Sequence, residues 1–167
     1  MLLFKERDML TPEQRQTYIQ TIADLPGNLE NAIASLTETQ LTTPYLSDEW
    51  SVVQNVHHMA DSHMNSFIRL KMILTEDHPA LKPYNQDAWV KMVDEVSLEL
   101  ENSLSILRGL HRRWVMVFKN LSDADWQRTG HHPEVGTVTV DDMLDTYAAH
   151  CRDHLDQIQR TLAAAGN

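Results

Sequence analysis

With 167 residues, of which 42% are hydrophobic, the chain is long enough to bury a substantial core, and we expect residues 1–167 to form one domain. The 14 Lys and Arg against 24 Asp and Glu give a net charge of -10, which argues against a nucleic acid partner because phosphate binding needs a basic surface. A single cysteine excludes an intrachain disulfide and any multi-cysteine zinc or iron–sulfur site.

The N-terminal residues do not read as a targeting segment. Charged residues at positions 5–8 interrupt the apolar start, and no cleavage site of small residues follows. No stretch of the chain approaches the roughly 18 uninterrupted apolar residues that a membrane helix needs. The single cysteine also fits a reducing compartment. We therefore expect a soluble, cytoplasmic protein that does not bind membranes.

Helical periodicity dominates the chain, since glycine and proline are few and no long stretch alternates strictly between apolar and polar residues. N-capping residues mark the starts of three long helices: Thr11, Ser51 and Thr139. Pro26 and Gly27 are expected to bend or break the first of these helices. The long helices are expected over residues 12 to the mid-thirties, 51–75, 97–120 and 140–165.

The connections between the long helices differ in length. Residues 42–50 form a polar connection between the first two helices. A long excursion begins at residue 76, where prolines keep the first half non-helical before a short helix near residues 85–94. A turn of helix at 122–125 and a loop at 129–139, with a short extended stretch, precede the last helix. Four long helices with two long connections predict an all-α four-helix bundle with crossover connections and a short extra helix.

The last helix carries a histidine pair with the spacing of metal ligands. His150 and His154 are spaced i and i+4, so they lie one turn apart on one face and can hold a single ion. His154 lies at the edge of the apolar stripe of this helix, and His150 lies about 40° further round. This flanking position suits a site that is partly buried yet open to a ligand, although the same spacing is often incidental.

The three histidines of the second long helix point in three directions. His63 lies on the apolar side of the helix, and His57 lies on its flank. His58 points almost oppositely, on a polar strip that also carries Asp61, Asn65 and Arg69. Periodicity alone nominates His63 as the buried histidine and leaves His58 at the surface, so it does not identify a metal ligand.

Three features of the sequence occur together: Trp50 at the opening of the second helix, HHMADSHMNSFIRLK at residues 57–71, and HCRDHLDQI at residues 150–158. In this combination the chain resembles the DinB superfamily, and most closely its YfiT-like branch, whose members are described as metal-dependent hydrolases. The similarity covers most of the chain, because it extends through the segments LTTPY, LTEDHPALKPYNQDAW, LHRRW and HHPE.

The resemblance implies a four-helix bundle with a divalent metal ion bound by three histidines, His58, His150 and His154. Where periodicity leaves His58 at the surface, the family pattern selects it, so the polar strip must face a pocket rather than bulk water. Three neutral imidazoles leave coordination positions open, as catalytic sites do. Such a ligand set suits zinc or nickel and does not suit magnesium or calcium.

The resemblance also suggests roles for residues around this ion. Asp61 is expected to orient a ligand or to act as a general base, Arg69 to bind a carboxylate of the substrate, and Asn65 to hydrogen-bond the substrate. His111 on the third helix and His132 in the following loop are candidates for lining the substrate pocket. For each of these residues, a plain structural or surface role is an equal alternative.

Members of the superfamily include transferases that add low-molecular-weight thiols to electrophiles, and others are described only as hydrolases. We therefore expect this chain to transfer a bacillithiol-like thiol to a small electrophilic substrate at the metal site. Hydrolysis by a metal-activated water is the first alternative. A non-catalytic, metal-stabilised binding protein of the stress response is the second, and a homodimer is possible.

Overall fold

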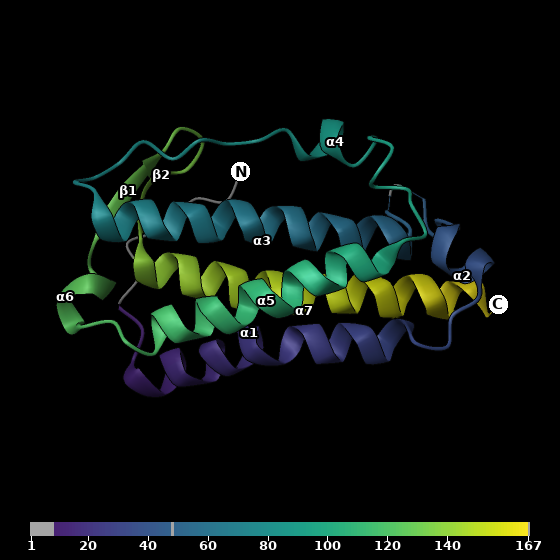
Figure 1. Cartoon of the computed structure of the whole chain (residues 1–167), viewed down its shortest axis with the longest axis horizontal. Coiled ribbons are helices and arrows are strands. Elements are labelled where there is room, and N and C mark those ends of the chain that lie inside the picture. Colours follow the sequence, from purple (N-terminus) through teal and green to yellow (C-terminus); the bar gives the residue numbers. More distant parts are fainter. Residues whose placement is uncertain (1–8, 48, 167) are drawn as a thin grey trace.

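Four long helices pack into a bundle in this computed structural model, which describes residues 9–47 and 49–166 (Figure 1). The long helices are α1 (Pro12–Ile33), α3 (Val52–Thr75), α5 (Leu100–Phe118) and α7 (Val140–Ala165). The predicted all-α four-helix bundle is confirmed. The charged residues 5–8, which argue against a signal peptide, lie outside the described residues.

The long helices that follow one another in the sequence are not all neighbours in space. α1 packs against α5 and α7, and α3 packs against the same two helices, so α1 and α3 lie diagonally across the bundle. α1 and α7 run in one direction, whereas α3 and α5 run in the other (Figure 1). This topology requires crossover connections, as predicted, and it makes α3 and α7 antiparallel neighbours.

The connection between α3 and α5 runs back along the length of α3 (Figure 1). It contains the short helix α4 (Gln86–Trp89), and its first part pairs with a hairpin of β1 (Thr129–His132) and β2 (Gly136–Thr139). The backbone of His131 accepts a hydrogen bond from the N–H of Leu81 and donates one to the carbonyl of Pro79, both at 2.8 Å. The hairpin therefore fixes the start of this crossover over the polar strip of α3.

Helix boundaries differ from the sequence prediction at the short helix and at α5, which spans Leu100–Phe118 and not residues 97–120. The short helix in the crossover is only four residues long and is followed by turns. α1 is unbroken although Pro26 lies inside it. A proline cannot donate the helical hydrogen bond to the carbonyl four residues earlier, which here is that of Ile22. That carbonyl accepts instead from Nδ1 of His111 on α5, at 2.6 Å, so the helix continues without an unpaired buried oxygen.

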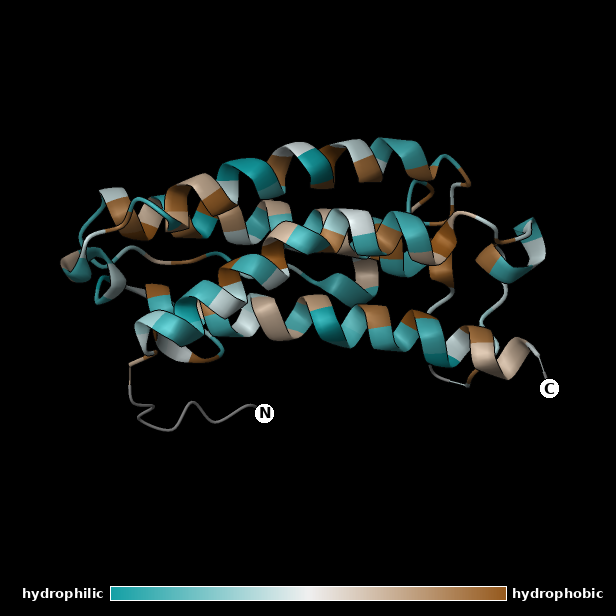
Figure 2. Cartoon of the chain, turned by 90° about the horizontal axis from the view of Figure 1, so that it is seen from below, coloured by the Kyte–Doolittle hydropathy of each residue, from teal (hydrophilic) through white to brown (hydrophobic). Residues whose placement is uncertain are grey.

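The two shorter connections carry the remaining elements. α2 (Glu38–Thr42) lies between α1 and α3, and α6 (Asp123–Trp126) lies between α5 and the hairpin. Along each long helix, apolar and polar residues alternate in short bands, as expected when one face is buried (Figure 2). Leucines from every long helix are at most 1% exposed: Leu25, Leu70, Leu107 and Leu144. In the described part of the chain, no helix is both long and apolar enough to cross a membrane.

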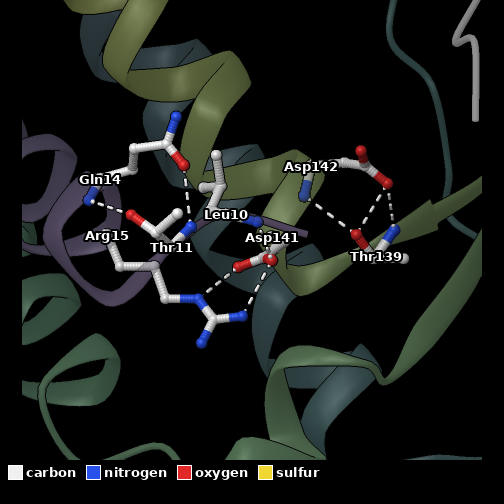
Figure 3. A network of polar contacts seen from close by, with 7 residues as sticks. All are labelled: Leu10, Thr11, Gln14, Arg15, Thr139, Asp141 and Asp142. Carbon is white, nitrogen blue, oxygen red and sulfur yellow. Dashed lines mark hydrogen bonds and ion pairs between the residues drawn. The ribbon is translucent and has the colours of Figure 1, made fainter. Parts of the chain in front are cut away.

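A buried carboxylate joins the N-terminal ends of α1 and α7 (Figure 3). Both helices begin at the same end of the bundle, so their positive dipole ends lie side by side. Asp141, which is 4% exposed, accepts hydrogen bonds of 2.8 to 2.9 Å from the N–H of Leu10 and from Nε and Nη2 of Arg15. Capping boxes begin both helices, at Thr11 and Thr139. The carboxylate therefore stabilises this parallel pair.

Replacing Asp141 with alanine should lower the free energy of unfolding by about 3 kcal/mol, because the partly buried guanidinium of Arg15 would lose its partner. Urea unfolding followed by circular dichroism measures the change. The matched control is Asp156→Ala, whose ion pair with Arg160 lies exposed on the same helix and should contribute far less. Equal losses in the two variants would contradict the structural role of Asp141.

Candidate metal centre

Three imidazoles converge between the antiparallel helices α3 and α7. The Nε2 atoms of His58 and His150 are 3.4 Å apart, and those of His150 and His154 are 3.2 Å apart. One turn of α7 separates His150 from His154, so both face α3, which supplies His58. In residues 9–47 and 49–166 these three form the one cluster of His, Cys, Asp or Glu whose ligand atoms all lie within 4.8 Å of one another.

The spacing of these nitrogens fits a divalent first-row ion. Imidazole nitrogens that lie about 2.0–2.1 Å from a tetrahedral ion are roughly 3.3 Å from one another. The two close Nε2 distances, 3.4 and 3.2 Å, lie on either side of that value. Three protein ligands leave at least one position on such an ion for a water or a substrate, as a catalytic site requires.

All three imidazoles are kept neutral by their surroundings. Burial lowers the pKa of His58 to about 3 and that of His154 to about 4, and it lowers the pKa of His150 well below its ordinary value. The neighbouring imidazoles lower the pKa of His58 and His150 further, because two cations so close together repel each other. At neutral pH, protons therefore do not compete with an ion for the lone pairs.

His154 is oriented by Asn55, which lies one turn before His58 on α3. The amide nitrogen of Asn55 donates to the carbonyl of Ser51 at 3.0 Å, so its oxygen is free to accept from Nδ1 of His154 at 2.7 Å. Nε2 of His154 therefore carries the lone pair that points toward the other two imidazoles. The ring of Trp50 lies against both His58 and His154, with centroids 4.6 and 6.1 Å away.

His63 and Ser62 also reach the site from α3. Nε2 of His63 lies 3.0 Å from Nδ1 of His150, and Oγ of Ser62 lies 3.4 Å from Nε2 of His150. His63 is fully buried, as its periodicity indicates, but it is bonded to a member of the cluster and is not simply packed. His57 lies apart from the cluster, because its ring nitrogens contact the carbonyl of Ser97 and the hydroxyl of Ser103.

Asp61 is paired with Glu95, which comes from the crossover and is 3% exposed. Burial raises the pKa of both carboxyl groups, and the charge of Asp61 raises that of Glu95 further. The two groups therefore hold a proton between them at neutral pH. Asn65 donates its side-chain amide to the backbone carbonyl of Asp61 in the same helix, at 2.9 Å. The polar strip thus lies under the crossover and is not a solvated face.

Arg69 and His132 line one pocket of about 200 Å³ beneath the crossover. Most of the other lining residues are apolar: Leu81, Val135, Val138, Met143 and Tyr147. Nε and Nη2 of Arg69 donate to the carbonyl of Lys82 at 3.1 and 2.6 Å, so this residue also attaches the crossover to α3. The ring centroid of Tyr147 lies 5.5 Å from that of His150, so one lining residue of the pocket contacts the histidine cluster, although none of the three histidines lines the pocket itself.

His111 does not line this pocket but a separate one between α1 and α5, so its expected place in the substrate site stays a prediction. It is 1% exposed on α5, and its Nε2 lies 2.8 Å from Nδ1 of His63. The face of α5 that carries His111 packs against α1 and α3, whereas the crossover lies on the outer side of α3. His111 therefore contacts the cluster only through His63.

Reasoning from the sequence missed Asn55, Ser62 and Glu95, and it identified His63 only as a buried residue. Asn55 carries a usable signal, because a polar amide among the apolar residues of a buried helix must find a hydrogen-bond partner. His63 carries the same signal for the same reason. Glu95 carries none, since it lies in an irregular segment where periodicity does not indicate burial.

Comparisons with known proteins agree with this geometry. Residues 21–158 match the family model of the DinB superfamily. The chain is 38% identical to the Bacillus subtilis protein named "Putative metal-dependent hydrolase YfiT", over 93% of this chain and 88% of that one. A similarly named protein of Oceanobacillus iheyensis is 43% identical, over 84% of this chain and 81% of its own length.

A solved structure of YfiT from Bacillus subtilis has the same fold. That protein is described as "a probable metal-dependent hydrolase with an unusual four-helix bundle topology". It superposes with a TM-score of 0.92 and 36% identity, covering 98% of this chain and 94% of that one. The resemblance inferred from Trp50 and the two histidine segments is confirmed.

Acidification should unfold the metal-free protein early. Burial lowers the pKa of His111 to about 4 and of His63 well below its ordinary value, as it does for the three clustered histidines. Because the unfolded histidines titrate near pH 6.5, unfolding takes up protons below that pH, and the contribution of these histidines to stability should be full above it and fall as the pH drops toward 4. Glu95, whose pKa is raised to about 8, acts in the opposite direction but offsets only about one of these protons.

Urea midpoints measured from about pH 7.5 down to pH 5 test this expectation, and their slope should correspond to more than one proton. The control is His131→Gln, which replaces an exposed imidazole and should keep the same slope. A midpoint that does not change over this pH range would contradict the assignment of buried neutral histidines.

Proposed function

The chain belongs to the DinB superfamily, and we propose on this premise that it is a metal-dependent enzyme that binds its ion through His58, His150 and His154. The observation that carries the proposal is the convergence of three neutral imidazoles. The Nε2 atom of His150 lies 3.4 Å from that of His58 and 3.2 Å from that of His154. An all-imidazole donor set suits Zn²⁺ or Ni²⁺. When bound, such an ion supplies a Lewis acid that lowers the pKa of a water or thiol beside it.

The reaction that we propose first is transfer of a low-molecular-weight, bacillithiol-like thiol to a small electrophile. The thiol sulfur forms a bond to the electrophilic carbon, the leaving group departs with its electron pair, and the thiol proton passes to solvent. The sulfur has to come from a small molecule, because Cys151 is 1% exposed and burial raises its pKa to about 12. A thiol, with an ordinary pKa near 8.5, needs less help from a general base than water does.

The state of Asp61 favours the thiol over water. Asp61 shares a proton with Glu95 instead of standing free as a base, and in the described part of the chain no carboxylate completes the three-histidine cluster. Hydrolysis is the second candidate, and the names of the relatives favour it. In that reaction Asp61 and Glu95 would supply the proton that the leaving group needs.

The pocket beside Tyr147 is the proposed binding place of the substrate. Its apolar lining would hold the carbon skeleton of the substrate, and its wall also carries the polar side chains of Arg69, His132 and Thr146. Because Nε and Nη2 of Arg69 already donate to the carbonyl of Lys82, Nη1 is the nitrogen with which Arg69 would bind a substrate carboxylate. Asn65 donates its side-chain amide to the backbone carbonyl of Asp61, and in this way it would hold in place the part of α3 that carries Asp61.

The ligand assignment predicts that His58→Ala and His154→Ala lose the ion. Elemental analysis of the purified proteins should find about one ion per chain in the wild type and far less in both variants, because two imidazoles bind a divalent ion much more weakly than three. His131→Ala removes an exposed histidine and is the matched control, which should retain the ion. Full metal content in either ligand variant would contradict the assignment.

The choice of nucleophile can be decided with the metal-loaded protein. We expect it to join monochlorobimane to at least one of bacillithiol, mycothiol and glutathione, with His154→Ala reduced to the uncatalysed rate. Ester or amide hydrolysis without thiol transfer would replace the first candidate with the second. If the ion stabilises the fold and neither reaction is catalysed, the protein is a metal-stabilised binding protein and the enzyme proposal fails.

A further inference from the structure

A line of hydrogen-bonded imidazoles crosses the core of the bundle and ends at the cluster. Its first contact joins Nδ1 of His111 to the carbonyl oxygen of Ile22, at 2.6 Å. Nε2 of His111 lies 2.8 Å from Nδ1 of His63, and Nε2 of His63 lies 3.0 Å from Nδ1 of His150. One nitrogen of each ring thus contacts the previous member of the line and the other contacts the next.

The line starts at a carbonyl that the helix itself does not use. Ile22 lies in α1, where its carbonyl would normally accept from the N–H four residues later. That residue is Pro26, which has no N–H to donate. The buried carbonyl therefore needs another donor, and His111 on the neighbouring helix α5 is that donor.

The carbonyl fixes the direction of every later hydrogen bond. An oxygen of this kind only accepts, so the proton of His111 must be on Nδ1 and its Nε2 must carry a lone pair. Because neutral rings have one donor and one acceptor nitrogen, His63 must then donate from Nδ1 and accept at Nε2. His150 in turn donates from Nδ1, and its Nε2 is left with a lone pair that faces His58 and His154.

The rings of His111 and His63 are neutral. They are 1% and 0% exposed, and their nitrogens contact only a carbonyl and other imidazoles, so a charged ring here would be buried without an anionic partner. His63 is also held edge-on against Trp114 and Tyr147, with ring centroids 5.6 and 5.4 Å away, so its plane is fixed as well. Its two nitrogens can therefore serve His111 and His150 in one arrangement only.

We propose that His63 and His111 are positioning residues that set the tautomer and ring orientation of His150, so that Nε2 is the nitrogen offered to the ion. This inference rests on the proposed function, because it assumes that His150 is a metal ligand. It gives His150 a counterpart to the contact by which Asn55 orients His154. Partners of this kind typically change metal affinity by about 10- to 100-fold.

Calorimetric titration of the metal-free protein with Zn²⁺ tests the effect on affinity. In His63→Leu the Nδ1 proton of His150 loses its acceptor, and we expect Zn²⁺ to bind about 10- to 100-fold more weakly with one site retained. In His63→Gln the side-chain oxygen can still accept from His150, and we expect most of the affinity to return. An affinity unchanged in His63→Leu would overturn the proposal, as would equal losses in the two variants.

The matched control is His57→Leu. His57 is another buried histidine of α3, 7% exposed, with both ring nitrogens bonded at 2.7 and 2.8 Å to groups outside the line. The variant His57→Leu should destabilise the fold as His63→Leu does. It should nevertheless leave the Zn²⁺ affinity within about twofold of the wild type, because the effects of groups without shared partners are independent. An equal loss of affinity in His57→Leu would mean that general destabilisation explains the result.

A second measurement examines the tautomers without any metal. Long-range ¹H–¹⁵N correlation spectra of the metal-free wild type should show His111, His63 and His150 all protonated on Nδ1. Replacing His111 with leucine should release His63 and His150 from this single pattern. An Nε2–H tautomer for His150 in the wild type would overturn the proposal.

The two proposals fail in different ways. If the wild type binds no Zn²⁺ while the three histidines show the expected Nδ1–H pattern, the metal-site function fails and the line of imidazoles stands as a structural feature. If the wild type binds Zn²⁺ and His63→Leu binds it equally well, the metal site stands and the positioning role is overturned.

Discussion

The hydrogen-bonded line of imidazoles constrains all four long helices at once. Its members come from each of them: Ile22 from α1, His111 from α5, His63 from α3 and His150 from α7. Apolar packing is non-directional, so it tolerates small rotations of a helix, whereas a hydrogen bond weakens steeply when its angle changes. A buried donor or acceptor without a partner costs about 1–3 kcal/mol. The line therefore sets the rotation and height of each helix relative to the others.

The topology of the bundle brings this line to a place where an ion can bind. Because α1 and α3 lie diagonally, α3 and α7 become antiparallel neighbours, and His58 meets a pair that is about ninety residues away in the sequence. The same arrangement places the N-terminal ends of α1 and α7 side by side, where Asp141 offsets their dipoles. The crossover that this topology requires covers the outer side of α3 and contributes Glu95 and the carbonyl of Lys82 to the surroundings of the site.

Much of the fold and the centre of the site could be predicted from the sequence, for local reasons. Capping residues such as Ser51 and Thr139 bond only within their own first turn, so the starts of the capped long helices were predicted correctly. The spacing of His150 and His154 fixes their common face on one helix. The choice of His58 came from the family pattern and not from periodicity. Glu95 and the pairing of Asp61 could not be anticipated, because an irregular crossover has no period from which its contacts follow.

The sequence by itself determined the helices, their capped starts, the histidine pair and the direction in which each side chain leaves its helix. Only the tertiary structure decided what each direction faces. His58 and His63 point to nearly opposite sides of α3, yet they are 4% and 0% exposed, because α5, α7 and the crossover cover the helix on several sides. Likewise, Pro26 removes a hydrogen bond inside α1, as its chemistry requires. Whether the helix breaks there depends on a donor from another helix, and His111 of α5 supplies it.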